Sequence, residues 1–299
     1  HCESSAASDV YKRQDLILDI RLNTLDKFVD YFVIVESTST HSGEKNELKF
    51  DIKKYKDFKD KIIYLIYENI PKEIVNLDTI INEKHKEYNK IMNAVYRENS
   101  HRNYISEGLK NASNEDIIMI SDIDEIPNLE EKTFSNINKK ILMFQQDMFY
   151  YKFNLKLPNT KWVGTKACKF KNFKNPQWLR NVKDRKYKFY RLDTLFSETK
   201  YQSIEVKKNG GWHFTNIKTA EEIKHKLNSY LHHNEFEKSS LDIEDIQDII
   251  SNQKTIYNLK ADKRIYKIGE GEKLEKIEVS HLPNYIKNNE LKYKKWIQE

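Results

Sequence analysis

Apolar and polar residues follow one another in blocks along the first half of the chain, and each block predicts a helix or a strand. The predicted elements are, in order, a helix over Leu16, Ile17, Ile20, Leu22 and Leu25, a strand over 31–36, a polar loop over 37–45, a strand over 61–67, a helix over about 83–109 and a strand over 117–120. Helices that alternate with apolar strands are typical of an α/β fold whose parallel sheet is covered on both faces. We therefore expect such a sheet up to Ser121.

The pattern changes in the second half. Residues 140–153 and 162–173 predict aromatic-rich strands, 210–214 another strand and 221–232 a helix, and the lysine-rich tail from about 239 is helical in its first part. No Pro/Gly-rich linker and no internal repeat separates the halves. We expect a single domain over 15–299 whose later half covers the mouth of the sheet.

The first 14 residues differ from the rest. They contain no initiator Met, no apolar core of a signal peptide and no hydrophobic periodicity. We interpret 1–14 as a foreign prefix and leave it out of the fold argument.

Composition excludes several protein classes. Hydrophobic residues make up 38% and charged residues 33%, and no apolar run approaches the ~18 residues that a membrane-spanning helix needs. The net charge of +6 is modest for 299 residues, although 152–188 is rich in lysine. Two cysteines provide no disulfide framework, which favours a reducing compartment.

The strongest candidate site follows the strand at 117–120. Three carboxylates, Asp122, Asp124 and Glu125, come directly after this apolar run and precede Pro127. Carboxylates are not buried unpaired, so these side chains lie at the end of the strand, where α/β sheets bind ligands. Asp122 and Asp124, one residue apart, suit a divalent cation shared with a diphosphate.

Two other functions start from the same residues. An Asp-x-Asp phosphohydrolase uses the first aspartate as a nucleophile, but its motif usually stands near the start of the domain, with Thr or Val where Ile126 is found. A non-catalytic basic module that binds nucleic acid or an anionic glycan would use the lysines. Both remain as alternatives.

Arg102 is the second candidate. Tyr88, Met92, Val95, Asn99, Arg102 and Ser106 recur at helical spacing, which places this guanidinium on the side of the helix that faces the protein. A charge there needs a partner, either Glu98 one turn earlier, an acid of the sheet, or a bound diphosphate.

The third candidate cluster combines Gly210-Gly-Trp-His-Phe214 with the segment 232–235. His213 is a candidate ligand for the metal or the phosphate. Glu235 is the first candidate for a general base and Asp147 the second. Among the aromatic residues that we consider for stacking on a sugar are Tyr150, Tyr151, Phe153, Trp162 and Trp178.

Taken together and in this order, the motifs resemble glycosyltransferase family 17, the family of the enzyme that adds bisecting N-acetylglucosamine to glycoproteins. The matching segments are 19–25, 29–37 with 40–43, Glu98 and Arg102 before 121–127, and 210–214 with Lys226 and the His-x-Glu of 233–235. The match covers about 15–235, and the combination is far more specific than any one motif.

The resemblance implies a GT-A-type, Rossmann-like nucleotide-sugar transferase fold. It implies UDP-GlcNAc or a related donor, a divalent metal (Mn²⁺), and a glycan or glycoconjugate acceptor, with no nucleic acid. Asp122, Asp124 and His213 would then bind the metal, while Glu36, Arg102, Asp122 and His213 would bind the donor.

One departure concerns the start of the chain. Family members usually carry a strand ending in Asn-Glu before the first helix, and 1–14 occupies that place, so we expect the first strand of the fold to be missing. Animal members are Golgi-anchored. Richness in Lys, Asn and Ile indicates a microbial source, and we expect a cytoplasmic protein unless a membrane anchor is missing from this fragment.

Overall fold

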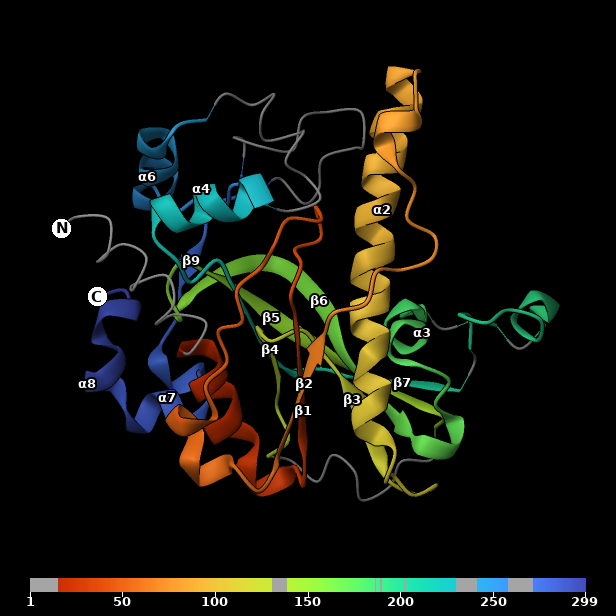
Figure 1. The fold of residues 1–299 in the computed structure, drawn as a ribbon. Helices are drawn as coiled ribbons and strands as arrows, with labels where there is room; N and C mark the ends of the chain where they lie inside the picture. The colour runs from red at the N-terminus through yellow and green to blue at the C-terminus, as the bar shows by residue number, and fades with distance from the viewer. Residues whose placement is uncertain are drawn as a thin grey trace.

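The computed structural model describes residues 16–130, 139–185, 187–188, 190–201, 203–229, 241–257 and 271–299 (Figure 1). A helix runs from Leu16 to Leu25. The strands are β1 (Phe32–Ser37), β2 (Ile62–Tyr67), β3 (Ile117–Ile120), β4 (Glu125–Pro127), β5 (Ile141–Tyr150), β6 (Leu155–Lys169), β7 (Ile204–Lys207), β8 (Gly211–Thr215) and β9 (Glu275–Lys276). The further helices are α2 (Glu83–Asn103), α3 (Pro176–Asn181), α4 (Ala220–Ser229), α6 (Ile243–Ser251), α7 (Asn284–Asn288) and α8 (Glu290–Tyr293).

These strands form two sheets. β1 and β2 pair in parallel as a two-stranded sheet. The second sheet has the order β3-β6-β5-β8-β4, with β7 paired to β5 and β9 paired to β6. It is mixed, because β6 is antiparallel to both β3 and β5, whereas β7 and β8 are parallel to β5.

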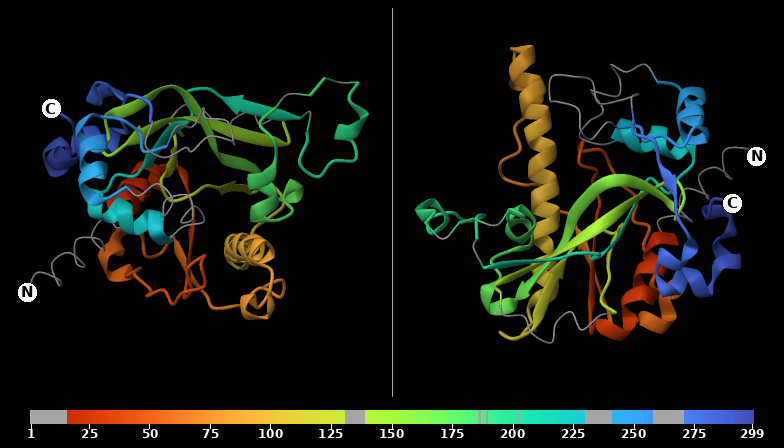
Figure 2. Two further views of the ribbon diagram at one scale, coloured as in Figure 1. Left: turned by 90° about the horizontal axis from the view of Figure 1, so that it is seen from above. Right: turned by 180° about the vertical axis from the view of Figure 1, so that it is seen from behind.

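The predicted parallel sheet is therefore wrong beyond β1 and β2. The 15-residue strand β6 follows β5 in the antiparallel direction and curls across the sheet (Figures 1 and 2). The C-terminal end of β6 pairs with β3. The local pattern could not show that β3 pairs with β6, because Ile117 is paired with Lys169 and Ile120 with Lys166, both far along the chain. The individual strands are confirmed to within a few residues for β1, β2, β3 and β5.

Helices cover the sheets on several sides. The predicted helix 83–109 is confirmed as α2 followed by a 3-10 segment, Tyr104–Leu109, which packs on β1 and β2. α2 also contacts α3 (Figure 1). The 16–25 helix lies beside α7 and α8, and its apolar side chains share a core with Phe144, Phe149 and Phe214 of the central strands.

The register of β5 and β8 separates two faces of the large sheet. Asp147 is paired with Trp212, and Met148 with His213. Because successive side chains of a strand point to opposite faces, Asp147 and Trp212 lie on one face and His213 on the other. Trp162 on β6 contacts the ring of His213, with 5.1 Å between ring centroids, so it shares the His213 face.

Candidate active site

The acidic residues lie in a tight turn between β3 and β4. The turn is closed by a hydrogen bond from the amide of Glu125 to the carbonyl of Asp122 (3.1 Å). Arg21, on the 16–25 helix, donates to the carbonyl oxygens of Asp122 (3.2 Å) and Glu125 (2.6 Å) and to the hydroxyl of Ser121 (2.5 Å). A side chain from 100 residues earlier thus holds the backbone of the turn.

Glu125 is completely buried, with 0% of its surface exposed. One of its carboxylate oxygens accepts from the Arg180 guanidinium (2.7 Å) and the Asp122 amide (3.0 Å), and the other from the Trp162 indole (2.7 Å). Gly164 leaves room for this carboxylate, since a Cβ there would lie 2.4 Å from its Cδ atom. Glu125 is therefore the buried counter-ion that fixes Arg180 within the site.

Asp122 lies between two guanidinium groups. Its Oδ2 accepts from Arg180 at 2.9 Å, and its Oδ1 is 3.5 Å from Arg102. Arg102 also pairs with Glu98 at 2.8 Å, so two of the partners that the sequence left open, Glu98 and an acid at the sheet, are both present. Burial and the neighbouring Glu125 carboxylate raise the pKa of Asp122, and the two arginines oppose that rise.

Asp124 has a different environment. Its Oδ2 atom lies 3.5 Å from Nε2 of His213, and its carbonyl accepts from the Phe214 amide at 2.9 Å. Burial alone would raise the pKa of Asp124, but His213 and then Lys226 lower it to about 2. Asp124 is therefore ionised at neutral pH. In return, Asp124 raises the pKa of His213 against the effect of burial.

Lys226 brings a further positive charge to this side of the turn from α4. Its ammonium donates to the side chain of Asn216 (2.9 Å), and burial lowers its pKa while Asp124 opposes that effect. The turn thus has arginines on the Asp122 side, and an imidazole and an ammonium on the Asp124 side.

Asp124 and His213 fit a divalent cation as a pair of ligands. Two neighbouring ligands of an octahedral cation at ~2.1 Å lie about 3 Å apart, close to the observed 3.5 Å. The other ring nitrogen of His213, Nδ1, is buried and has no hydrogen-bond partner among the described residues. The described part of the chain holds no group of three or more His, Cys, Asp or Glu side chains suited to a metal. Such a cation would therefore take further ligands from a bound diphosphate and water.

Other predicted site residues lie elsewhere. The Glu36 carboxylate accepts from the amides of Lys49 (2.7 Å) and Phe50 (3.1 Å) and from the Tyr64 hydroxyl (2.8 Å), so it fastens a loop to β1. Asp147 lies on the face of the sheet opposite His213. Glu235 lies outside the residues that the structure describes.

Sequence reasoning missed two arginines of the site. Arg21 stands between the buried residues Ile20 and Leu22 of a helix, a signal that it has a buried partner. Arg180 offered no comparable signal in the lysine-rich centre of the chain. Of the five aromatic residues considered for sugar stacking, Trp162 lies in the site, and the other four are buried.

Lys166 binds the backbone carbonyl of Arg180, and its burial predicts that the stability of the protein depends on pH. This buried lysine donates to the carbonyls of Arg180 (2.5 Å) and Val182 (2.7 Å) at the end of α3. Burial, followed by the charge of Arg180, lowers the pKa of Lys166 to about 8, whereas the unfolded chain keeps the ordinary value of 10.5. Between these values the unfolded chain binds more protons, so this lysine makes stability rise with pH.

We expect Lys166→Met to remove that contribution while keeping the aliphatic stem. The free energy of unfolding of the parent chain, relative to the variant, should rise between about pH 8 and pH 10, by at most about 1.4 kcal/mol per pH unit. Urea denaturation of both proteins across this range measures the difference. Parallel profiles would contradict the assignment.

The curled mixed sheet and the acidic turn at a strand end are compatible with a glycosyltransferase fold. Residues 10–297 match glycosyltransferase family 17, and the chain therefore belongs to this family. No curated protein and no solved structure matches the chain. Among the described residues, no helix is long and apolar enough to cross a membrane.

Proposed function

We propose that this glycosyltransferase moves N-acetylglucosamine from UDP-GlcNAc to a hydroxyl of a glycan, with inversion and with the help of a divalent cation such as Mn²⁺. The observation that carries the proposal is the pairing within the acidic turn. Asp122 and Glu125 are both paired with Arg180, whereas Asp124 faces His213 at 3.5 Å. The proposal includes a GT-A arrangement of the nucleotide-binding strands.

Departure of a diphosphate requires compensation of negative charge. A cation held by Asp124 and His213 would offset that charge when bound. Lys226 adds a positive charge beside Asp124. Arg102, predicted to contact the donor, is 16% exposed and is held by Glu98 and Asp122, so it would present a fixed guanidinium to the diphosphate.

Asp122 would act through hydrogen bonds. We predicted it both as a metal ligand and as a donor contact. Its oxygens face Arg102 and Arg180, an arrangement that favours the second role, toward the ribose or a water molecule. The same pairing disfavours the phosphohydrolase alternative, whose first aspartate must attack phosphorus. Glu36 would act on the donor through the loop that it fastens to β1.

Inversion at the anomeric carbon needs one carboxylate that takes the proton of the acceptor hydroxyl. We propose Glu235 for this role on the basis of the His-x-Glu motif. Asp147 is the less favoured choice, since it lies on the other face of the sheet from Asp124 and its neighbours are Lys156 and Lys161.

Two variants separate donor binding from transfer. In the parent chain, Mn²⁺ with UDP should raise the thermal unfolding temperature, and Asp124→Ala should abolish that rise because it removes a metal ligand. Glu235→Gln should keep the rise and lose transfer from UDP-GlcNAc by about 10²-fold or more. Asp57→Ala, at an exposed aspartate of the segment 52–58, is the matched control and should behave like the parent.

The roles of Asp124 as a metal ligand and of Glu235 as the general base can each be contradicted by one result. An unchanged rise in Asp124→Ala would end the metal assignment, and full transfer activity in Glu235→Gln would end the base assignment. An equal rise in unfolding temperature with several other nucleoside diphosphates would contradict the uridine donor. It would not contradict sugar transfer as the function.

A further inference from the structure

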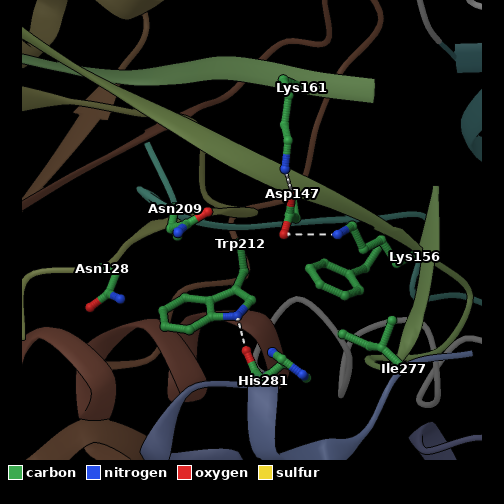
Figure 3. A pocket seen from close by; sticks show the side chains of 10 residues that line it. Asn128, Asp147, Lys156, Lys161, Asn209, Trp212, Ile277 and His281 are labelled. Atoms are coloured by element: carbon green, nitrogen blue, oxygen red, sulfur yellow. Dashed lines mark hydrogen bonds and ion pairs between the residues drawn. The ribbon is translucent and has the colours of Figure 1, made fainter. Parts of the chain in front are cut away.

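A polar pocket lies on the face of the large sheet opposite the one that carries His213. Its volume is about 460 Å³, within the ~300–1,000 Å³ typical of small-molecule sites. Asp147 of β5 and the indole of Trp212 line it (Figure 3), and both point away from the face that carries His213. The sheet therefore separates this pocket from Asp124.

The ring of Trp212 lines the pocket and is held by a hydrogen bond. The indole N–H of Trp212 donates to the carbonyl of His281 at 2.7 Å, which ties β8 to the segment before α7 (Figure 3). The ring is only partly buried, so it offers apolar surface to a ligand. The C–H face of a pyranose ring is a natural partner for such a surface.

Two asparagine side chains lie on one side of this ring, Asn128 and Asn209 (Figure 3). Each amide carries donors and an acceptor, the combination that sugar hydroxyls require. The Asn128 oxygen already accepts from the Glu130 amide at 3.1 Å, which holds this side chain in place. Their backbones are joined through Gly210, whose amide donates to the Gln145 carbonyl (2.7 Å) and whose carbonyl accepts from the Asn128 amide (2.9 Å). Asn209 itself has a left-handed backbone, with φ of 51°. The amides are thus presented by a constrained turn.

The charges of the pocket are unequal. Asp147 forms ion pairs with both Lys161 and Lys156, the latter at 3.2 Å (Figure 3). One carboxylate shared by two ammonium groups leaves an excess of one positive charge. A ligand with a carboxylate would reduce that excess, and a neutral ligand would not.

From these features we propose that the pocket binds an acidic saccharide, a pyranose that carries a carboxylate, at a site distinct from the donor site. Trp212 packs against the ring, Asn128 and Asn209 bind its hydroxyls, and Lys156 and Lys161 attract its carboxylate. In a glycosyltransferase, this site would hold a part of a glycan away from the reacting end. The proposal does not depend on the identity of the donor.

Methyl glucuronide and methyl glucoside form a suitable pair of probes, because they differ only in the carboxylate at C6. Titration of the full chain, followed by ligand-observed NMR, should show tighter binding of the glucuronide by about two- to fivefold at low salt, the range of an exposed ion pair. Lys161→Ala should bring the two affinities close together, since it leaves Lys156 and Asp147 balanced.

Asn209→Gly tests whether the side-chain amide of Asn209 binds the saccharide. The substitution adds no backbone strain, because glycine adopts a positive φ freely. It should weaken binding of both glycosides. Asn159→Gly is the matched control, an exposed asparagine with φ of 57° outside the pocket, and should leave both affinities unchanged. Binding of UDP with Mn²⁺ should be the same in all three variants, which shows that they are folded.

Equal affinity of the parent chain for the two glycosides would overturn the proposal, as would selectivity that survives Lys161→Ala. Saccharide binding that is lost together with UDP binding in Asn209→Gly would show that the effect belongs to the fold and not to this pocket. Failure of the donor proposal alone would leave the preference for the glucuronide in place.

Discussion

Replacement of Glu125 by alanine should lower the free energy of unfolding by about 3–5 kcal/mol, the cost of breaking a buried ion pair by removing one of its members. Glu125 is 0% exposed, and its removal takes the buried carboxylate away from the Arg180 guanidinium, which then keeps Asp122 as its acidic partner. The Trp162 indole and the Asp122 amide lose their acceptor at the same time. Urea denaturation monitored by circular dichroism measures the change.

Glu125→Gln separates the contribution of the Glu125 charge to stability from the contribution of its size and shape. Glutamine keeps an acceptor for Trp162 and fills the space beside Gly164, so its cost should be clearly smaller than that of alanine. Glu115→Ala is the control for losing any glutamate. Its carboxylate is exposed and pairs with Lys169 and Lys171, and its loss should leave the stability nearly unchanged. Equal effects at Glu125 and Glu115 would refute the buried-pair account.

The second large effect is expected at Gly211, the first residue of β8. Its φ of +128° is strained for any side chain, and a Cβ there would lie 2.2 Å from the carbonyl oxygen of Ile126. That neighbour is backbone of β4, which pairs with β8 directly behind the acidic turn. Gly211→Ala should therefore cost about 3 kcal/mol or more, as strain and overpacking combine.

Gly43→Ala is the matched control for positive φ alone. Its φ is +100°, but the atoms closest to a new Cβ belong to the end of the Arg97 side chain, which can move. Its cost should stay near 1 kcal/mol, and thermal or urea unfolding of both variants gives the comparison. A small effect at Gly211 would mean that β4 and β8 separate easily.

The sequence predicted most elements because apolar runs are local. The strands around Val33, Tyr64 and Met119 and the long helix α2 follow directly from residue spacing. The pairing of β3 with β6 was not predictable, because both strands are apolar and nothing local selects a neighbour. The predicted parallel sheet failed at this point.

The candidate site divides in the same way. The place of Asp122, Asp124 and Glu125 at a strand end follows from the abrupt change from apolar to acidic residues, and the pairing of Arg102 with Glu98 follows from helical spacing. The role of Arg180 does not, because its partners are 55 and 58 positions away. The sequence shows which residues are charged, but only the tertiary structure shows which charged residues pair with one another.

The contacts of Arg21 hold the acidic turn through its backbone. This arginine holds main-chain carbonyl oxygens, which every amino acid supplies, rather than the carboxylates of Asp122 or Asp124. These two contacts therefore do not depend on which side chains stand at positions 122 and 124. We expect substitutions at these two positions to leave the Arg21 contacts with the backbone in place, so that the same loop can carry other side chains.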